Sequence, residues 1–160
     1  MNRYSKIIRL LIVLCALSVG AMVLVLGAGS RDAAFVPPPF EPEAVTGTPG
    51  VPEGLGYREL DARVFRVGVC GEVVAQGDRA VLWFTNPAGN EVWLRLRILD
   101  ESGSILGQTG LLRPGEYVRS VHLTSVLAAG SAIVLKLMAY EPQTYHSAGA
   151  ATVSTTLRIE

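Results

Sequence analysis

Cysteine is scarce in this 160-residue chain, which contains only Cys15 and Cys70. Cys15 lies inside an uncharged apolar run, so a disulfide bond between the two is not geometrically reasonable. The region around Cys70 must therefore fold on its hydrophobic core without covalent cross-links. We expect Cys70 to be a small buried side chain, the commoner state of a free cysteine, and an exposed thiol that pairs between chains is the alternative.

Histidine is equally scarce, with only His122 and His146 in the chain. A metal site needs several ligands at suitable spacing. His122 has no acid or cysteine beside it in the sequence, and His146 shares a polar segment with Glu141 and Tyr145 that a surface loop explains equally well. We expect no metal and no cofactor.

Motifs of catalysis and phosphate binding are absent from the sequence. There is no Gly-x-Ser-x-Gly elbow, and Ser131 precedes a predicted strand instead of a helix. Gly103 and Gly107 lie in a predicted hairpin with no helix after it to bind a phosphate. Lys136 should point outward, so a buried lysine–asparagine cross-link is not predicted. We expect a non-enzymatic protein.

An excess of charge of either sign is also lacking. The chain carries 14 basic and 14 acidic side chains, and residues 57–160 carry ten of each. A nucleic-acid surface requires a basic stripe, and strong adhesion to anionic lipid requires a basic cluster. We therefore expect no nucleic-acid partner.

Residues 10–29 form a run of twenty residues without a charge. A helix rises about 1.5 Å per residue, so this run covers about the 30 Å thickness of the hydrocarbon core of a bilayer. Arg3, Lys6 and Arg9 precede the run and no acid does. The positive-inside rule then predicts a cytoplasmic N-terminus and an extracytoplasmic C-terminal region. The sequence predicts a single-pass protein of the cell membrane, with the lipid bilayer as partner of residues 10–29.

Two alternatives to this anchor depend on cleavage or lipid attachment. A signal peptide has an apolar region of about 7–15 residues, shorter than this run. The small residues around Gly29 would still permit cleavage there and secretion. A lipid-modified Cys15 is disfavoured because Leu14, not a small residue, precedes it. We interpret Cys15 as an ordinary membrane-embedded residue.

The composition divides the chain into three parts. Residues 1–29 are the predicted cytoplasmic tip and transmembrane anchor. Residues 30–56 contain six prolines and four glycines and predict an extended linker. A spacer is favoured over an SH3-type ligand on the outer side of a membrane, although Phe35, Val36 and Phe40 have the apolar side chains needed to dock locally on the domain. Residues 57–160 are about the size of one small domain.

The domain shows apolar–polar alternation of period two, separated by turn residues. The predicted strands are residues 61–69, 79–85, 91–99, 105–109, 116–123, 131–140 and 152–159. The clearest strand has an apolar face that includes Leu96, opposite a face that includes Arg95 and Arg97. Leu96 and Leu135 are expected to be central in the core. The pattern predicts an all-β immunoglobulin/fibronectin-like β-sandwich of about seven strands, preceded by one transmembrane helix, and a closed small barrel is the alternative.

Three finer predictions concern the ends of these strands. Residues 125–130 are interpreted as a short crossing segment, with one turn of helix as an option. Residues 141–149 are interpreted as a loop. In the last strand, Val153, Thr155 and Leu157 are expected to point inward together with Ile159.

The order of several short motifs carries a resemblance. These are Asn-Pro at 86–87, Trp-Leu-Arg-Leu at 93–96, the loop 100–103, Arg-Pro-Gly-Glu at 113–116 and Leu-Ala-Ala-Gly at 127–130. The chain resembles uncharacterised, single-pass membrane-tethered proteins of Gram-positive bacteria with an immunoglobulin-like extracytoplasmic domain. The resemblance implies a sandwich fold and an extracytoplasmic location, and it implies no active site.

Trp83 and Trp93 are the candidate interaction surface. Both alternate away from the faces that we assign to the core, and exposed aromatics often mark a binding patch. In an immunoglobulin plan their strands belong to different sheets, so the two indoles are expected to separate, whereas a plain hairpin would bring them together. The alternative is that each tryptophan caps the edge of the core. The predicted function is a binding or interaction module of a cell-envelope assembly with a protein partner. The alternative is a carbohydrate or cell-wall binding module that uses both tryptophans on a glycan.

Overall fold

The structure is a computed structural model that describes residues 4, 7–9, 11–15, 17–18, 35–125 and 127–160. The chain divides into two compact units, Met1–Val36 and Pro37–Glu160. The described residues between 4 and 18 are helical. No helix formed by the described residues combines the length and the apolar character needed to cross a membrane. Most of the predicted anchor, and the predicted cleavage site near Gly29, lie outside the described residues.

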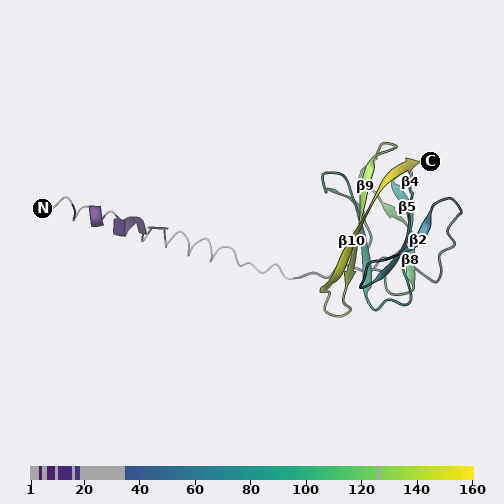
Figure 1. Cartoon of the computed structure of the whole chain (residues 1–160), viewed down its shortest axis with the longest axis horizontal. Coiled ribbons are helices and arrows are strands. Elements are labelled where there is room, and N and C mark those ends of the chain that lie inside the picture. Colours follow the sequence, from purple (N-terminus) through teal and green to yellow (C-terminus); the bar gives the residue numbers. More distant parts are fainter. Residues whose placement is uncertain (1–3, 5–6, 10, 16, 19–34, 126) are drawn as a thin grey trace. The chain divides into compact units, whose positions relative to one another are not determined.

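The unit Pro37–Glu160 is built from strands, so the all-β prediction is confirmed (Figure 1). The described strands are β1 (Val45–Thr46), β2 (Tyr57–Asp61), β3 (Arg66–Cys70), β4 (Val73–Gln76), β5 (Arg79–Asn86), β6 (Trp93–Leu99), β7 (Ile105–Gln108), β8 (Glu116–His122), β9 (Ala132–Tyr140) and β10 (Ser147–Ile159).

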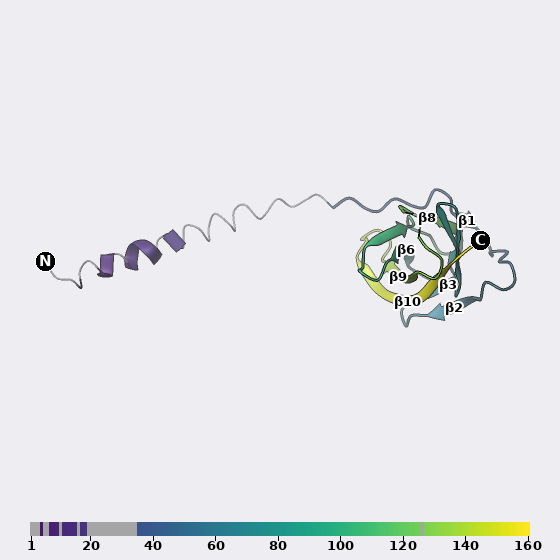
Figure 2. The same ribbon diagram turned by 90° about the horizontal axis from the view of Figure 1, so that it is seen from above.

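The strands form one curled sheet in the order β1-β8-β5-β4-β10-β9-β6-β7, with β3 paired to β5 and β2 to β3. Strand β10 connects the two halves of this sheet. Its first part pairs antiparallel with β9, and Leu157–Ile159 pair parallel with β4. Figure 2 shows the strands curling around a common interior. The curl brings the last strand in this order, β7, back beside β8, where Gly107 bridges to Leu123, the residue that follows β8.

The core fills the interior of the curled sheet. Leu94, Leu96 and Ile98 of β6 are buried, as are the alternate residues of β9, so the predicted alternation in these strands is confirmed. Leu96 and Leu135 are completely buried, as predicted. Strand β5 differs because both of its faces are covered: Val81 and Thr85 are buried as well as Ala80, Leu82 and Phe84.

A hairpin replaces the predicted strand 61–69. Strands β2 and β3 pair antiparallel, with Asp61 opposite Arg66. The turn between them is stabilised by the Asp61 carboxylate, which accepts a hydrogen bond of 2.9 Å from the Arg63 backbone N–H. Arg63 has a positive φ of 69°, and Val64 is exposed while Phe65 is buried. Residues 66–69 do lie in β3, but the prediction was wrong for residues 62–65, because a turn that starts at a single aspartate is a weaker signal than a pair such as Asn-Gly.

Part of the predicted linker 30–56 belongs to the β unit, which begins at Pro37. We call residues 39–47 the strap. The Leu111 N–H donates to the Pro39 carbonyl at 2.9 Å, and the Glu41 N–H donates to the Leu111 carbonyl at 2.9 Å. Strand β1, at the end of the strap, pairs with β8. Proline-rich composition predicts an extended segment, and in residues 39–47 this segment pairs with the backbones of Leu111 and β8.

Two side-chain contacts complete the attachment of the strap. A Glu41 carboxylate oxygen accepts a hydrogen bond of 2.7 Å from the Gly110 N–H. Both carboxylate oxygens of Glu43 lie 2.7 Å from the Arg79 guanidinium, and this hydrogen-bonded ion pair lowers the pKa of Glu43. The strap therefore lies against the segment that joins β7 to β8, which contains Gly110 and Leu111.

The C-terminal strand is longer than predicted, since β10 begins at Ser147 inside the predicted loop. Leu157 is buried, and Val153 and Thr155 are half-buried, but Ile159 is 51% exposed. Ile159 was therefore wrongly assigned to the core, because the last residues of β10 leave β9 and pair with β4. The described residues of 125–130 contain no helical turn.

Candidate functional site

Trp83 lies at an irregularity of β5. The pairing of β5 with β8 shifts register between Val81 and Phe84, which is the signature of a β-bulge. Trp83 has a φ of 50°, a conformation that bulky residues rarely adopt. The bulge places the indole on the outer side of the sheet, half-buried, while its neighbours Leu82 and Phe84 are completely buried. Backbone strain of this kind is maintained only when the surrounding structure requires it.

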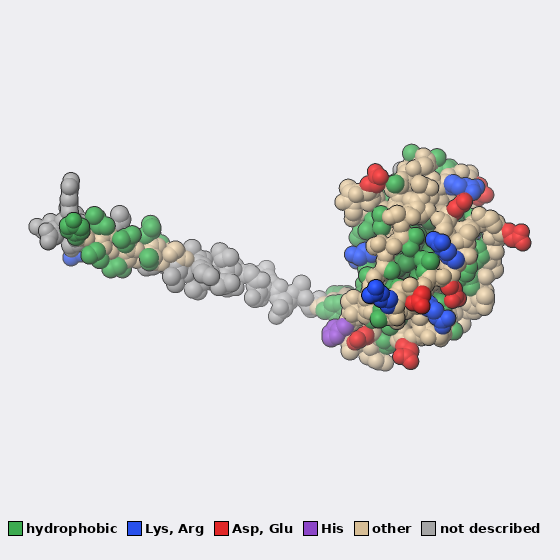
Figure 3. All heavy atoms as spheres, viewed as in Figure 1, with side chains coloured by type: hydrophobic (Ala, Val, Ile, Leu, Met, Phe, Trp, Pro, Cys, Tyr) green, Lys and Arg blue, Asp and Glu red, His purple; other side chains and the backbone are tan. Residues whose placement is uncertain are grey.

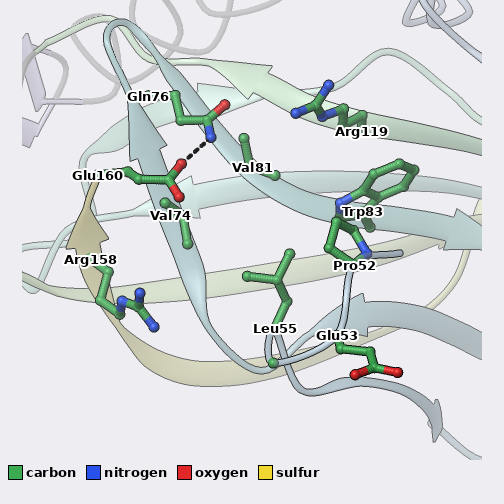
Figure 4. Close-up of a pocket in the computed structure, with 11 residues that line it drawn as sticks. Pro52, Glu53, Leu55, Val74, Gln76, Val81, Trp83, Arg119, Arg158 and Glu160 are labelled. Carbon is green, nitrogen blue, oxygen red and sulfur yellow. Dashed lines mark hydrogen bonds between the residues drawn. The ribbon is translucent and has the colours of Figure 1, made fainter. Parts of the chain in front are cut away.

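A groove of about 310 Å³ lies beside Trp83 (Figure 4). We call it the Trp83 groove. Its apolar lining comes from Val74 of β4, from Val81 and Trp83 of β5, and from Pro52 and Leu55. The segment that carries Pro52 and Leu55 is attached through the Leu55 carbonyl, which accepts a hydrogen bond of 3.2 Å from the Glu72 N–H.

Charged side chains surround this apolar lining. At one end Arg158 pairs with Glu72 at 2.6 Å, and Gln76 donates a hydrogen bond to Glu160. At the other end the Arg119 guanidinium lies 5.8 Å from the centre of the Trp83 ring. Arg119 forms no ion pair with the described residues, so its charge is available to a partner.

The Trp83 side chain contacts one aromatic neighbour and lacks one polar partner. Its ring stacks on that of Tyr117 of β8, with centroids 5.9 Å apart and planes inclined by 28°. The indole Nε1 is buried and has no hydrogen-bond acceptor among the described residues. In Figure 4 the nitrogen edge of the indole faces Pro52, which has no acceptor on its ring. An unpaired buried N–H is rare enough in native proteins to require an explanation.

Trp93 lies in a different aromatic cluster at the start of β6. The Phe40 ring meets it edge-on at 4.9 Å and 78°, and the Tyr145 ring approaches at 5.1 Å and 60°. The Arg113 guanidinium lies over the Phe40 ring, 3.7 Å from its centre. Trp93 therefore attaches the strap to the sheet.

The structure separates the two predicted site residues. Trp83 is on β5 and Trp93 is on β6, and the described pairings place β5 against β3, β4 and β8, but β6 against β7 and β9. The expected separation of the two indoles is confirmed. Sequence reasoning did not find Arg119 or the segment 52–55, because no local pattern joins residues so far apart in the chain.

His122 and Lys136 do not line the Trp83 groove. His122 lies 3.1 Å from Asp78, an acid that the sequence analysis did not place beside it. A two-residue turn between β4 and β5 creates this pair, which is exposed on both sides. The described residues contain no cluster of three or more His, Cys, Asp or Glu side chains suited to a metal ion. Lys136 is half-buried on β9, on the face opposite Leu135 and Leu137.

Cys70 is completely buried, as predicted. Burial disfavours the thiolate and raises the pKa of the Cys70 thiol to about 11. A thiol with so high a pKa is a poor nucleophile at neutral pH. Cys70 is therefore a packing residue and is not part of the candidate site.

Neither the protein-family models nor the curated proteins include a match to this chain. Among solved structures, the crystal structure of CopC from Methylosinus trichosporium OB3b is similar, with 18% sequence identity and a TM-score of 0.37. The match covers 65% of this chain and 95% of that one. A TM-score this low does not establish a common fold.

Proposed function

We propose that this chain is a non-enzymatic, membrane-anchored interaction module whose β unit works outside the cytoplasm. The charge bias of Arg3, Lys6 and Arg9 and the apolar run 10–29 support the anchor and its orientation. Membership in the membrane-tethered Gram-positive proteins that the motifs resemble is part of this proposal. So is an immunoglobulin-like strand arrangement, which the separation of β5 from β6 supports.

The Trp83 groove carries the proposal of a binding function. It combines a half-buried tryptophan, an apolar lining and an unpaired arginine on one surface. Tryptophan and arginine are the residues most enriched in the energetic centres of protein interfaces. Charged side chains, among them Arg119 and the Arg158–Glu72 pair, border the apolar lining of the groove. Acidic and basic side chains are also interspersed over the face of the β unit seen in Figure 3. A mixed patch of this kind fits a protein partner better than nucleic acid.

The carbohydrate alternative has less support. A glycan platform needs exposed aromatic rings in one plane. Trp93 instead meets its neighbours Phe40 and Tyr145 at 78° and 60°, and it shares no strand pair with the strand of Trp83. We therefore assign the interaction surface to the Trp83 groove, and we assign Trp93 to the attachment of the strap.

Photo-crosslinking in intact, wall-stripped cells tests the proposed function. A benzoylphenylalanine at the position of Glu53, on the rim of the groove, should give a discrete protein adduct that disappears with Trp83→Ala. The same probe at Ile105, an exposed residue of β7, is the control and should give no such adduct. An adduct that persists in Trp83→Ala, or is equally strong from position 105, would contradict the proposed surface.

Protease accessibility tests the proposed orientation. Protease added to the same cells should digest or release the β unit, because the positive flank of the apolar run remains in the cytoplasm. Complete protection of the β unit until the membrane is opened with detergent would contradict an extracytoplasmic location.

A further inference from the structure

One wall of the Trp83 groove is formed by a turn of the chain itself. This turn carries Pro52 and Leu55 and lies across the outer side of β4 and β5. Leu55 packs in the same lining as Val74 and Val81, which are 4% and 5% exposed although they point away from the main core. The surface chemistry therefore suits a polypeptide with proline and aliphatic side chains.

Two polar groups at the Trp83 end of the groove have no hydrogen-bond acceptor or counter-ion among the described residues. The Trp83 Nε1–H is a buried donor without an acceptor, and the Arg119 guanidinium is an exposed cation without a carboxylate. Both groups are hydrogen-bond donors, and neither can accept. A ligand that pairs with both groups must therefore bring oxygen acceptors, and the acceptor for Arg119 should carry a negative charge that lies away from the Glu53 carboxylate on the rim of the groove.

We propose that the Trp83 groove binds an extended, acidic peptide segment of a partner protein. Its apolar side chains contact Val81 and Leu55, a carboxylate pairs with Arg119, and a carbonyl oxygen accepts the hydrogen bond from Trp83 Nε1 as Pro52 moves aside. Pro52 and Gly54 are both exposed, and no atom lies within 4 Å of a Cβ placed at Gly54, so the space around this turn is open. The inference rests on the proposed function and specifies its ligand.

A peptide is favoured over a sugar by the surroundings of the indole. Tyr117 stacks with the ring and Arg119 lies over it, so the aromatic surface that a sugar would need is partly occupied. Carboxylates pair with an arginine through two parallel hydrogen bonds, which neutral sugar hydroxyls cannot reproduce with the same strength.

Selection from a phage library of random dodecapeptides tests the ligand class. The target is the full chain in nonionic detergent, and Arg119→Glu is the counter-selection target. Selected peptides should contain Asp or Glu beside proline or aliphatic residues, and should bind as synthetic peptides. No enrichment, or enrichment of basic peptides only, would overturn the inference, as would preferential binding of a chitotetraose probe.

Variants of the full chain then locate the site. Arg119→Gln and Trp83→Phe should each weaken binding of a selected peptide at least fivefold, because one removes the charge and the other removes the N–H while keeping a ring. Arg63→Gln, an exposed arginine of the β2–β3 turn, is the matched control and should stay within twofold. Equal binding by all variants would overturn the inference. If cells give the crosslink that depends on Trp83 but the library yields no peptide, the ligand class is wrong and the proposed function stands.

Discussion

The edge of the Phe40 ring meets the Trp93 ring with centroids 4.9 Å apart and planes at 78°. This contact joins a residue from the proline-rich segment to the first residue of β6. Aromatic pairs in such an edge-to-face arrangement contribute about 0.5–1.5 kcal/mol beyond the area that they bury. The strap is thus a packed part of the β unit, and its loss should be measurable.

Gly110→Ala should detach the strap. A Cβ at Gly110 would lie 2.5 Å from the Glu41 backbone nitrogen and 2.7 Å from its Cα, so the backbone of the strap cannot remain in place. The amide of Leu111, which donates to Pro39, should then exchange with deuterium much faster in a mass-spectrometric measurement. Gly50→Ala is the control because a Cβ there meets nothing within 4 Å. Unchanged exchange at Leu111 would contradict the docked strap.

Leu96→Ala and Leu135→Ala should each lower the free energy of unfolding by about 2–5 kcal/mol. Both side chains are completely buried, on the neighbouring strands β6 and β9. Denaturant unfolding of the full chain measures the change. Ile105→Ala, at a position 44% exposed, should cost far less. Equal effects at the buried and exposed positions would show that the sheet faces are assigned wrongly.

Trp93→Ala should destabilise the protein more than Trp83→Ala does. Trp93 contacts two rings and attaches the strap, so we expect a loss of about 3 kcal/mol. Trp83 contacts Tyr117 and has an unpaired Nε1, so its removal should cost less than about 2 kcal/mol. Thermal melts of the two variants provide the comparison. A larger loss at Trp83 would mean that this residue belongs to the core and is not available for binding.

The stability of the protein should fall between about pH 9 and pH 11. Burial raises the pKa of Cys70 from 9.0 to about 11, so the neutral thiol stabilises the folded state fully below pH 9, and this contribution is lost as the pH approaches 11. The expected loss over this range is at most about 3 kcal/mol, since each pKa unit corresponds to about 1.4 kcal/mol. Burial also raises the pKa of Tyr57, which acts in the same direction.

Urea unfolding at pH 8 and pH 10.5 measures this dependence, with Cys15→Ser as the background so that one thiol remains. Adding Cys70→Ala should leave only the smaller pH-dependence due to other groups. An identical pH-dependence with and without the Cys70 thiol would show that Cys70 is not responsible.

The sequence by itself determined the all-β class, most strand positions and the alternation of the core in β6 and β9. These features are local: period-two patterns set which residues share a face, and Asn-Pro or Pro-Gly sets where a strand ends. The turns at Gly103 and Gly115 are also locally determined, because each needs a residue with positive φ and both glycines adopt it.

Only the tertiary structure decided which distant residues meet. The strap was interpreted as a linker because proline prevents a regular element, and its contacts with Leu111, Gly110 and Arg79 have no local signal. The Trp83 groove has the same origin: the bulge in β5, Arg119 of β8 and Pro52 come together through strand pairing and backbone strain. Periodicity specifies the face on which a residue lies, whereas strand pairing and register specify its neighbours.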